Sequence, residues 1–444
     1  MSDSARSRSS ELRRDLPEAA SSREGRSPGP VAANERIETL DVLRGFALLG
    51  ILTMNIRAMA APMGAYMYPY ALFDFTGASR AAYIFTSVFF DLKMMGLFSM
   101  LFGAGVLLYA AKPTASGGPP RGLWFRRMFW LLVIGLVHAY LIWEGDILVP
   151  YALCGLLLLW WMRRFSAGVL LGSGIGFLTV GVLLSIGFSA MWHTMPEQVR
   201  AEELEFWMPT RQQAQAQLAP MLGSYMDVVS SRAPFVVETQ TMYFMMFFLW
   251  RCGGMMLLGM ALYKWGFLDG RRPIRTYAVA AAICLPLGLL LAWYGSVVLE
   301  RIRFAMPQRT LADVWNYAGA VLVSIGYAAL LIVLVKRGAL AGLRRALAAV
   351  GQMAFSNYLS QSIITSVLFL GWGFGLAGRF DYARQLLIVL AIWVVQLVVS
   401  PVWLRYYRFG PAEWLWRSLT YWKRQPMRRE TPSASYPGPL PAGV

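Results

Sequence analysis

The sequence predicts an all-α protein, namely a polytopic transmembrane helical bundle with about ten spans. Of its 444 residues, 57% are hydrophobic and 15% are charged, whereas soluble domains contain roughly 25% charged residues. Apolar stretches of about 20 residues, the length that crosses a bilayer as a helix, recur along the chain. The net charge of +17 does not indicate nucleic-acid binding, because most Lys and Arg residues lie in short clusters between the apolar stretches, as topology signals do.

The apolar stretches give the order of the expected spans. They lie at residues 41–61, 82–111, 124–143, 147–162, 168–191, 241–263, 275–297, 314–335, 352–371 and 384–406. The second stretch is too long for one straight span, so we expect it to include an interfacial piece ahead of Met94. The third and fourth spans form a hairpin, because only the short turn EGD separates them.

The distribution of basic residues predicts the orientation. Lys and Arg are more frequent in the two tails and in the loops on their side than in the loops on the other side, so both termini are expected in the cytoplasm. Residues 1–35 and 423–444 have the composition of disordered cytoplasmic tails, and residues 36–422 form the bundle. The single long loop, 192–240, is then extracytoplasmic. It suits a lid or an acceptor platform, and a short amphipathic helix on the membrane surface fits it equally well.

The first expected span contains polar residues that each cost free energy inside a membrane. It reads RIETLDVLRGFALLGILTMNI and holds Asp41, Arg44 and Asn55. Arg44 and Asn55 are about three helical turns apart, so they share one face, and Asp41 precedes Arg44 by one turn. One interpretation is a polar cavity inside the bundle. The other is a structural Asp41–Arg44 pair at the inner interface, with Asn55 as a bridge between helices.

The third expected span carries a deep histidine. His138 lies about 21 Å from the cytoplasmic end of its helix, the same depth that Asn55 has on the first span. Glu144 and Asp146 follow at the outer mouth, so either carboxylate can orient the imidazole of a general base. A histidine that only links two helices is the alternative. With two histidines and no clustered cysteines in the chain, the sequence predicts no metal site.

Three further polar residues within the spans are candidates for donor or substrate contacts. Lys93 is expected near the outer edge of the second span, where a lysine can also snorkel. Arg251 lies too deep to snorkel, so we expect it to meet a carboxylate or to line a cavity. Asn357 belongs to a polar patch on the ninth span, which also suits hydrogen bonding between helices. The patch consists of Ser356, Asn357, Ser360 and Gln361.

Several segments together resemble one family over residues 36–422. They are DVLRGFALLGILTMN, LFSMLFGAG, GLVHAYLIWEGDIL, FLWRCGGMMLLGMALYKWGF, VGQMAFSNYLSQS and FGPAEWLWRSLTY. In these segments the chain resembles the YeiB-like bacterial membrane proteins, and the last segment is the most specific. That family more distantly resembles the transmembrane acyltransferase superfamily. The resemblance implies about ten helices around a pore, through which cytoplasmic acyl-CoA donates an acyl group to an acceptor at the other face.

The resemblance also gives some residues a role. Arg44 matches a basic residue that the polysaccharide O-acetylases of the superfamily carry on their first span. Asn55 stands where those enzymes have a histidine and where the heparan-type enzymes have an asparagine. The heparan-type enzymes use a histidine in their first outer loop, but residues 62–81 contain none. We therefore infer that His138, on another helix, is the base.

The leading hypothesis is an acyltransferase in the bacterial plasma (inner) membrane that acts on an extracytoplasmic sugar, lipid or small molecule. His138 would remove the acceptor proton with help from Asp146, and Asn55 would hydrogen-bond the developing oxyanion. Acyl-CoA would be a co-substrate, with no tightly bound cofactor. The residues expected to bind the donor or substrate are Arg44, Asp41, Lys93, Arg251 and Asn357. The alternatives are a transporter or exporter of a small anionic or amphipathic solute, and a non-catalytic membrane partner or sensor.

Overall fold

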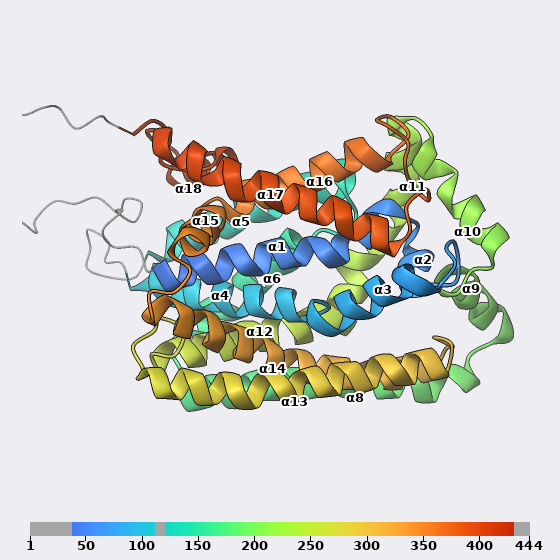
Figure 1. Cartoon of the computed structure of the whole chain (residues 1–444), viewed down its shortest axis with the longest axis horizontal. Helices are drawn as coiled ribbons and strands as arrows, with labels where there is room; N and C mark the ends of the chain where they lie inside the picture. The colour runs from blue at the N-terminus through green and yellow to red at the C-terminus, as the bar shows by residue number, and fades with distance from the viewer. Residues whose placement is uncertain (1–37, 112–119, 430–444) are drawn as a thin grey trace, which may run out of the picture.

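Long apolar helices run side by side in the computed structural model, which describes residues 38–111 and 120–429 (Figure 1). In these ranges the chain forms no β-sheet, only one isolated bridge between Tyr407 and Arg428. The predicted fold class, an all-α polytopic membrane bundle, is therefore confirmed. The expected tails 1–35 and 430–444 lie outside the described residues.

The helices follow one another along the chain with short connections. The longer α-helices are α1 (Glu38–Ala60), α3 (Gly77–Phe89), α4 (Lys93–Ala110), α5 (Arg121–Val137), α8 (Ala167–Met191), α12 (Leu249–Lys264), α13 (Ile274–Arg301), α14 (Gln308–Lys336), α16 (Ala354–Phe369) and α17 (Tyr382–Tyr406). The shorter α-helices are α2 (Met63–Met67), α6 (Leu148–Cys154), α7 (Trp160–Met162), α9 (Glu197–Trp207), α10 (Arg211–Leu218), α11 (Tyr225–Glu238), α15 (Ala341–Gln352) and α18 (Pro411–Tyr421). The π-helical turns are η2 (His138–Ile142), η3 (Gly155–Leu159) and η6 (Thr239–Phe248).

Eight of the described helical segments are long and apolar enough to cross a membrane. They correspond to all of the expected spans except the fourth and the ninth. The fourth is the shorter apolar helical segment Leu148–Met162, and the ninth is the 16-residue helix α16. Both are packed among the longer helices, and the expected number of about ten spans stays a prediction.

The second expected span is broken, as its length required. Helix α3 ends at Phe89 and α4 begins at Lys93. Between them Leu92 takes a left-handed backbone conformation with φ of 59°, which a regular α-helix cannot contain. The break brings the polar residues Asp91 and Lys93 to a helix end inside the bundle.

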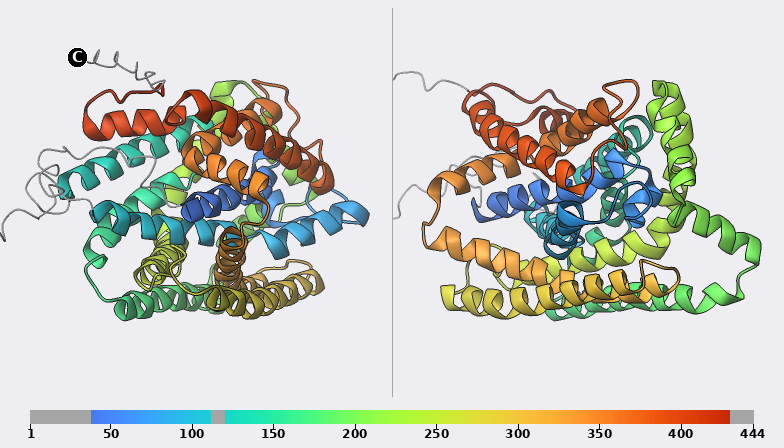
Figure 2. Two further views of the ribbon diagram at one scale, coloured as in Figure 1. Left: turned by 60° about the vertical axis from the view of Figure 1, so that its left-hand side comes forward. Right: turned by 45° about the vertical axis from the view of Figure 1, so that its right-hand side comes forward.

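Helix α1 runs through the interior of the bundle, with other helices around it (Figures 1 and 2). Its neighbours are α4, α15, α16 and α17. Glycine makes the approach to α15 close, because a Cβ at Gly45 would overlap the carbonyl oxygen of Leu347, and one at Gly351 would overlap that of Asp41. Helices α8, α13 and α14 form a layer along one side of the bundle, at the bottom of Figure 1.

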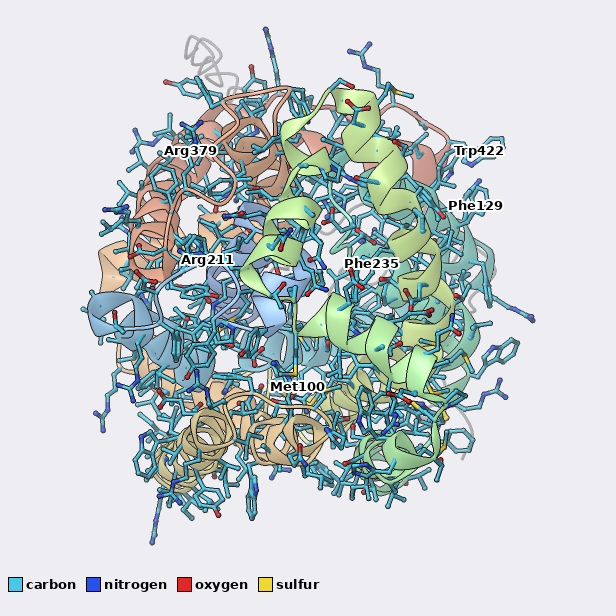
Figure 3. The ribbon with its side chains drawn as sticks, turned by 90° about the vertical axis from the view of Figure 1, so that its right-hand side faces the viewer. Met100, Phe129, Arg211, Phe235, Arg379 and Trp422 are labelled. Atoms are coloured by element: carbon cyan, nitrogen blue, oxygen red, sulfur yellow. The ribbon has the colours of Figure 1, made fainter. Side chains whose placement is uncertain are left out.

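The long loop 192–240 is largely helical. It contains α9 and α10, and α11 continues through η6 into α12. Figure 3 looks at this end of the bundle, where α10, which begins at Arg211, and α11, which carries Phe235, lie in front of the other helices. The loop is hydrogen-bonded to the bundle: the N–H of Gly371 donates to the carbonyl of Met221 at 2.9 Å, and the Tyr225 hydroxyl donates to that of Leu141 at 2.9 Å.

The start of α1 and helix α18 lie together at the opposite end of the bundle (Figure 1). This arrangement agrees with the expectation that both chain ends are on one side. Residues 423–429 were expected to belong to a disordered tail, but they pair with the end of α17. The N–H of Arg408 donates to the carbonyl of Met427 at 2.9 Å, and the N–H of Arg429 donates to that of Tyr406 at 3.0 Å.

Candidate functional site

His138 lies where the third span changes its helical form. Helix α5 ends at Val137, and the chain continues from His138 as the π-helical turn η2. A π-turn widens the helix locally and is frequent at functional sites. The chain then reverses through residues 143–147 and starts α6. This tight reversal brings Asp146 back against the imidazole of His138.

Asp146 holds the imidazole in one orientation. Its Oδ1 lies 2.8 Å from Nδ1 of His138, and its Oδ2 accepts a hydrogen bond of 2.7 Å from the N–H of Val149, in the first turn of α6. A carboxylate only accepts hydrogen bonds, so Nδ1 carries the hydrogen and Nε2 presents a lone pair. The expectation named Asp146 or Glu144 for this role, and the geometry selects Asp146.

A serine hydroxyl faces the free nitrogen of that imidazole. The Oγ of Ser362, in the middle of α16, lies 2.9 Å from Nε2 of His138. His138 and Ser362 are 0% exposed and Asp146 is 4% exposed. Ser362, His138 and Asp146 therefore form a continuous buried line of hydrogen bonds. This is the arrangement in which a base activates a hydroxyl and a carboxylate orients the base. The same bonds tie α5 to α16, so they also stabilise the bundle.

Aromatic side chains enclose the Ser362–His138 pair. The ring of Tyr358 lies 5.2 Å from the imidazole and that of Trp143 lies 6.4 Å from it, measured between centroids. Trp143 is 5% exposed, and its Nε1 has no hydrogen-bond partner among the described residues. Gly145 packs directly on the indole, because a Cβ there would overlap the ring. Trp143, whose ring packs near the imidazole, therefore carries a buried N–H donor without an acceptor in the described residues.

Asn55 lies at the same level of the bundle as Ser362. Helices α1 and α16 run in the same direction, because Leu48 and Tyr358 belong to one core cluster near the inner end and Thr365 Oγ1 lies 2.9 Å from Met59 Sδ near the outer end. Asn55 precedes Met59 by about one turn. The structure shows no hydrogen bond between Asn55 and the Ser362–His138–Asp146 line in the part of the chain that it describes. The predicted approach of Asn55 and His138 to one site therefore stays a prediction.

A partly exposed line runs along the otherwise buried helix α1. Beyond Glu38, the residues of α1 that are not buried are Arg44, Phe46, Ile51 and Asn55. Three of these, Arg44, Ile51 and Asn55, follow a spacing of seven and four residues, which keeps them on one helix face. These three side chains therefore remain partly exposed along one face of α1, from Arg44 to Asn55.

Arg44 forms the ion pair with Asp41 that the sequence suggested as one alternative. Its Nη1 lies 3.0 Å from Oδ1 of Asp41, and the Arg44 side chain is still 31% exposed. A second cation, Arg127 of α5, lies within electrostatic range of Arg44 and stacks on the ring of Trp416 at 3.6 Å. The inner end of the exposed line therefore carries two guanidinium groups.

Lys93 and Arg251 belong to a second polar cluster. Both are fully buried, so Lys93 does not snorkel. Its Nζ donates to Oδ1 of Asn316 and to the carbonyl of Ser87, and Asn316 in turn donates to Asp91. Arg251 donates to backbone carbonyls of Tyr317 and Leu92 and covers the Tyr317 ring at 4.4 Å. These bonds join α4, α12 and α14, and none of them reaches the Ser362–His138–Asp146 line.

Asn357 and Gln361 connect α16 with α17. The Asn357 amide donates to the Ser400 hydroxyl at 3.0 Å, and the Gln361 amide donates to Gln396 at 2.9 Å. The polar patch therefore links α16 to α17 by hydrogen bonds, which is one of the two interpretations that the sequence allowed. Glu144, the other carboxylate beside the histidine, lies 3.7 Å from Nε of Arg232 on α11. Nowhere in residues 38–111 and 120–429 do three or more His, Cys, Asp or Glu side chains gather as metal ligands.

Ser362 is the site residue that sequence reasoning missed. The analysis of the ninth span took its polar residues as one patch, although they occupy different faces. A sorting by helical face separates Tyr358, Ser362 and Ser366, at intervals of four residues, from the residues that contact α17. That row of hydroxyl groups was the signal in the sequence that could have identified Ser362. The sequence of the ninth span does not show that a histidine of another helix, His138, lies beside it.

Comparison with known proteins shows what the whole chain is similar to. A family model described as "Protein of unknown function (DUF418)" matches residues 262–423. The chain is 32% identical to the uncharacterised protein YeiB of Escherichia coli (strain K12), over 87% of this chain and 96% of that protein. It is 31% identical to the uncharacterised protein YxaH of Bacillus subtilis (strain 168), over 90% of this chain and 98% of that protein. No solved structure matches the chain significantly.

Proposed function

The chain belongs to the YeiB-like family of bacterial membrane proteins and is a multi-pass membrane protein. We propose that it transfers an acyl group from cytoplasmic acyl-CoA to an acceptor on the extracytoplasmic side of the plasma membrane. The acceptor is a hydroxyl or amino group of a sugar, lipid or small molecule.

The observation that carries this proposal is the 2.9 Å contact between a hydroxyl group and Nε2 of His138. Acyl transfer requires a base that removes a hydroxyl proton while the oxygen attacks a carbonyl carbon. His138 supplies the lone pair, and Asp146 stabilises the imidazolium that forms. The pair is buried, and water exclusion strengthens these electrostatic interactions and protects an acyl group from hydrolysis.

The inner end of the bundle suits a coenzyme A donor. The charge of Arg44 acts on Arg127 of α5, and guanidinium groups bind phosphate in two parallel hydrogen bonds. The partly exposed line on α1 leads from Arg44 to Asn55. Phe98 of α4, which packs against the cluster that contains Leu48, adds an apolar surface. A phosphate group at the inner end and a thioester arm along α1 fit these features.

The opposite end suits the acceptor. Helix α11 reaches the site through Arg232, which lies 3.7 Å from Glu144, two residues before Asp146. The α9–α11 segment lies over this end of the bundle (Figure 3). An acceptor that enters from this side would approach His138 from the side of its π-helical turn, away from the donor.

A solute transporter is the second candidate, and the Lys93 cluster favours it. Lys93 and Arg251 are fully buried cations inside the spans, and the carboxylate close to them is Asp91, which is hydrogen-bonded through Asn316. Buried cations in membrane helices mark solute paths in many transporters. This cluster is therefore the place to look for an anion if acyl transfer is not found.

The test uses the purified full chain in lipid nanodiscs. Acetyl-CoA and octanoyl-CoA are the donors, and release of the free thiol of coenzyme A is followed with and without sugar and lipid acceptors. The expected result is thiol release that falls by about 10²–10⁴-fold in His138→Gln, the range for loss of a general base. Thiol release at the same rate in His138→Gln would exclude this site. No release from either thioester would exclude the enzyme and favour the transporter.

A further inference from the structure

We propose that Ser362 is the nucleophile of this reaction and that it carries the acyl group as a covalent ester between two half-reactions. The inference rests on the proposed function. The alternative is direct transfer, in which donor and acceptor occupy the site together. Ser362 occupies the place that the acceptor hydroxyl would need, in hydrogen-bond contact with the base.

The first support is that Ser362 is the hydrogen-bond partner of Nε2 among the described residues. Asp146 uses Nδ1 of the imidazole, so Nε2 is the basic atom, and the Oγ of Ser362 lies 2.9 Å from it. The second neighbour of that Oγ is the carbonyl of Tyr358, one turn earlier, at a longer 3.4 Å. The nucleophile–base and base–carboxylate distances are both within the range of an activated serine.

The second support is the position of Ser362 near the middle of α16. It lies about 12 Å from the first residue of that helix and about 10 Å from its last residue, at 1.5 Å per residue. A donor from one side and an acceptor from the other would each reach this position separately. A serine that holds the acyl group removes the need for both large substrates to be present together, since each half-reaction uses one side.

In the first half-reaction, His138 takes the Ser362 proton at Nε2, and Oγ forms a bond to the thioester carbonyl carbon. The carbon–sulfur bond then breaks, and the coenzyme A sulfur leaves with the proton from Nε2. The products are an acyl ester on Ser362 and free coenzyme A thiol. Atoms and electrons balance without an oxidant, a reductant or a metal ion.

In the second half-reaction, the acceptor hydroxyl takes the place of the thiol. His138 removes its proton, and the acceptor oxygen attacks the ester carbonyl of acylated Ser362. The bond to Oγ breaks, and Oγ recovers its proton from Nε2. The acylated acceptor leaves, and the Ser362–His138–Asp146 line is restored for another donor.

The developing negative charge on the carbonyl oxygen requires a hydrogen-bond donor. Trp143 offers one, because its buried Nε1–H has no acceptor in the described chain and its ring lies 6.4 Å from the imidazole, between centroids. An unpaired buried donor costs free energy, and a transient oxyanion would satisfy it. We assign to the Trp143 indole the role of a positioned donor in both half-reactions.

The deciding experiment looks for the acyl-enzyme in the wild-type protein in nanodiscs. Acetyl-CoA labelled in its acetyl group is added without acceptor, the reaction is quenched in acid after milliseconds to seconds, and the protein is digested and analysed by mass spectrometry. The expected result is one acetyl group on the peptide that contains Ser362, released by hydroxylamine, with one equivalent of coenzyme A thiol. A small fluorophosphonate is expected to label the same serine without any donor.

Matched variants separate this chemistry from misfolding. Ser362→Ala should show no adduct, and its transfer rate should fall on the order of 10³-fold or more. Ser366→Ala is the control, because Ser366 is also buried on α16 and its hydroxyl is bonded to the carbonyl of Ile142 at 3.1 Å. It should retain the adduct and the rate. Ser362→Cys should form an adduct too, now a thioester, which hydroxylamine cleaves at neutral pH.

Two results would overturn the inference in distinguishable ways. If wild-type protein transfers acetyl groups without an adduct, and Ser362→Ala transfers at the wild-type rate, then transfer is direct and only the acyl-serine is wrong. If wild-type protein releases no thiol from acetyl-CoA or octanoyl-CoA and the fluorophosphonate leaves Ser362 unlabelled, then the proposed function fails together with it.

Discussion

Oδ1 of Asp146 lies 2.8 Å from Nδ1 of His138, and both side chains are buried in the bundle. The other oxygen of the same carboxylate accepts the N–H of Val149 at 2.7 Å. Asp146 therefore accepts an N–H of the first turn of α6 and orients the base at the same time. The start of a helix is a rigid element, so this carboxylate holds the imidazole toward Ser362 without relying on a flexible loop.

The substitution Asp146→Asn should reverse the tautomer of His138. The side-chain amide of the asparagine has one acceptor oxygen, and the N–H of Val149 donates to it. The amide nitrogen therefore faces Nδ1 of His138 and donates a hydrogen bond to it. The imidazole hydrogen then moves to Nε2, which no longer accepts the Ser362 proton. We expect the acyl-transfer rate to fall by about 10³–10⁴-fold, with little effect on the amount of folded protein. Thiol release and size-exclusion profiles measure the two effects.

The matched control for this substitution is Glu144→Gln. Glu144 lies two residues away, but its carboxylate is 3.7 Å from Arg232 and makes no hydrogen bond with His138 in the described structure. Its loss should change the transfer rate by no more than a few-fold. Equal losses in both variants would mean that negative charge near the site matters and that the tautomer does not.

Glu413 of α18 should stabilise the helix that carries Ser362. Its Oε1 accepts the N–H of Phe355 at 2.7 Å and that of Ser356 at 3.2 Å, in the first turn of α16. These are N–H groups that a helix start leaves without partners. We expect Glu413→Ala to lower stability by about 1–3 kcal/mol. Glu413→Gln keeps an acceptor oxygen and should stay close to wild type. Thermal unfolding in detergent measures both.

The same residue gives a prediction for pH. Burial raises the pKa of the Glu413 carboxyl above its usual value, against the opposing effect of its hydrogen bonds. The folded protein therefore holds this proton more tightly than the unfolded chain does. The resulting stabilisation is complete below the unfolded pKa of about 4.3 and is lost as pH rises through the folded pKa. Glu413→Gln should remove this loss. An identical pH dependence of the melting temperature in wild type and variant would contradict the assignment.

The sequence was sufficient for the membrane fold and for half of the site. Most apolar stretches located the helices to within a few residues, because a span must be long and apolar in any topology. The helix of the sixth stretch begins earlier than expected, at Tyr225 and not at residue 241. Equal helical intervals placed Asn55 and His138 at one depth. Asp146 was found as an orienting carboxylate because it follows His138 closely in the chain.

The remaining features depended on contacts between distant segments. Ser362 meets His138 across more than 200 positions of the chain, and a single sequence contains no signal for which faces of two helices meet. Lys93 was expected near the membrane edge, but the break at Leu92 turns it inward to Asn316. Arg251 was expected to meet a carboxylate or to line a cavity, and its guanidinium donates to backbone carbonyls that the same break and α14 present.

Cysteine labelling tests the orientation. Gly122 at the start of α5 and Gln212 on α10 are exposed, and they lie in regions that the basic residues place on opposite sides of the membrane. In a Cys284→Ala background, Gly122→Cys should react with an impermeant maleimide only in inverted vesicles, and Gln212→Cys only in intact cells. Cys154 and Cys252 are buried and should contribute little background. Labelling of both positions from the same side would refute the topology.

The last prediction concerns Arg44, whose Nη1 lies 3.0 Å from Oδ1 of Asp41 one turn earlier on α1. A partly exposed pair at this spacing contributes only about 0.2–0.5 kcal/mol to stability, and lysine can maintain it. A phosphate group, in contrast, uses the planar fork of arginine in two parallel hydrogen bonds, which lysine cannot reproduce. Arg44→Lys should therefore leave folding and membrane abundance intact but weaken coenzyme A binding by about tenfold or more, which is about 1.4 kcal/mol.

Calorimetry with coenzyme A in nanodiscs measures this affinity, and Arg345→Lys is the matched control. Arg345 lies on the exposed face of α15, where its Nε donates only to the carbonyl of Ala341 at 3.3 Å, so its loss should not change the affinity. Wild-type affinity in Arg44→Lys would remove Arg44 from the donor site and leave the Ser362–His138 chemistry untouched.

An equal loss in both variants would indicate that the summed positive charge of the inner surface attracts the donor. In that case raising the salt concentration should weaken binding in every variant alike, since screening acts on the total charge and not on the geometry of one guanidinium.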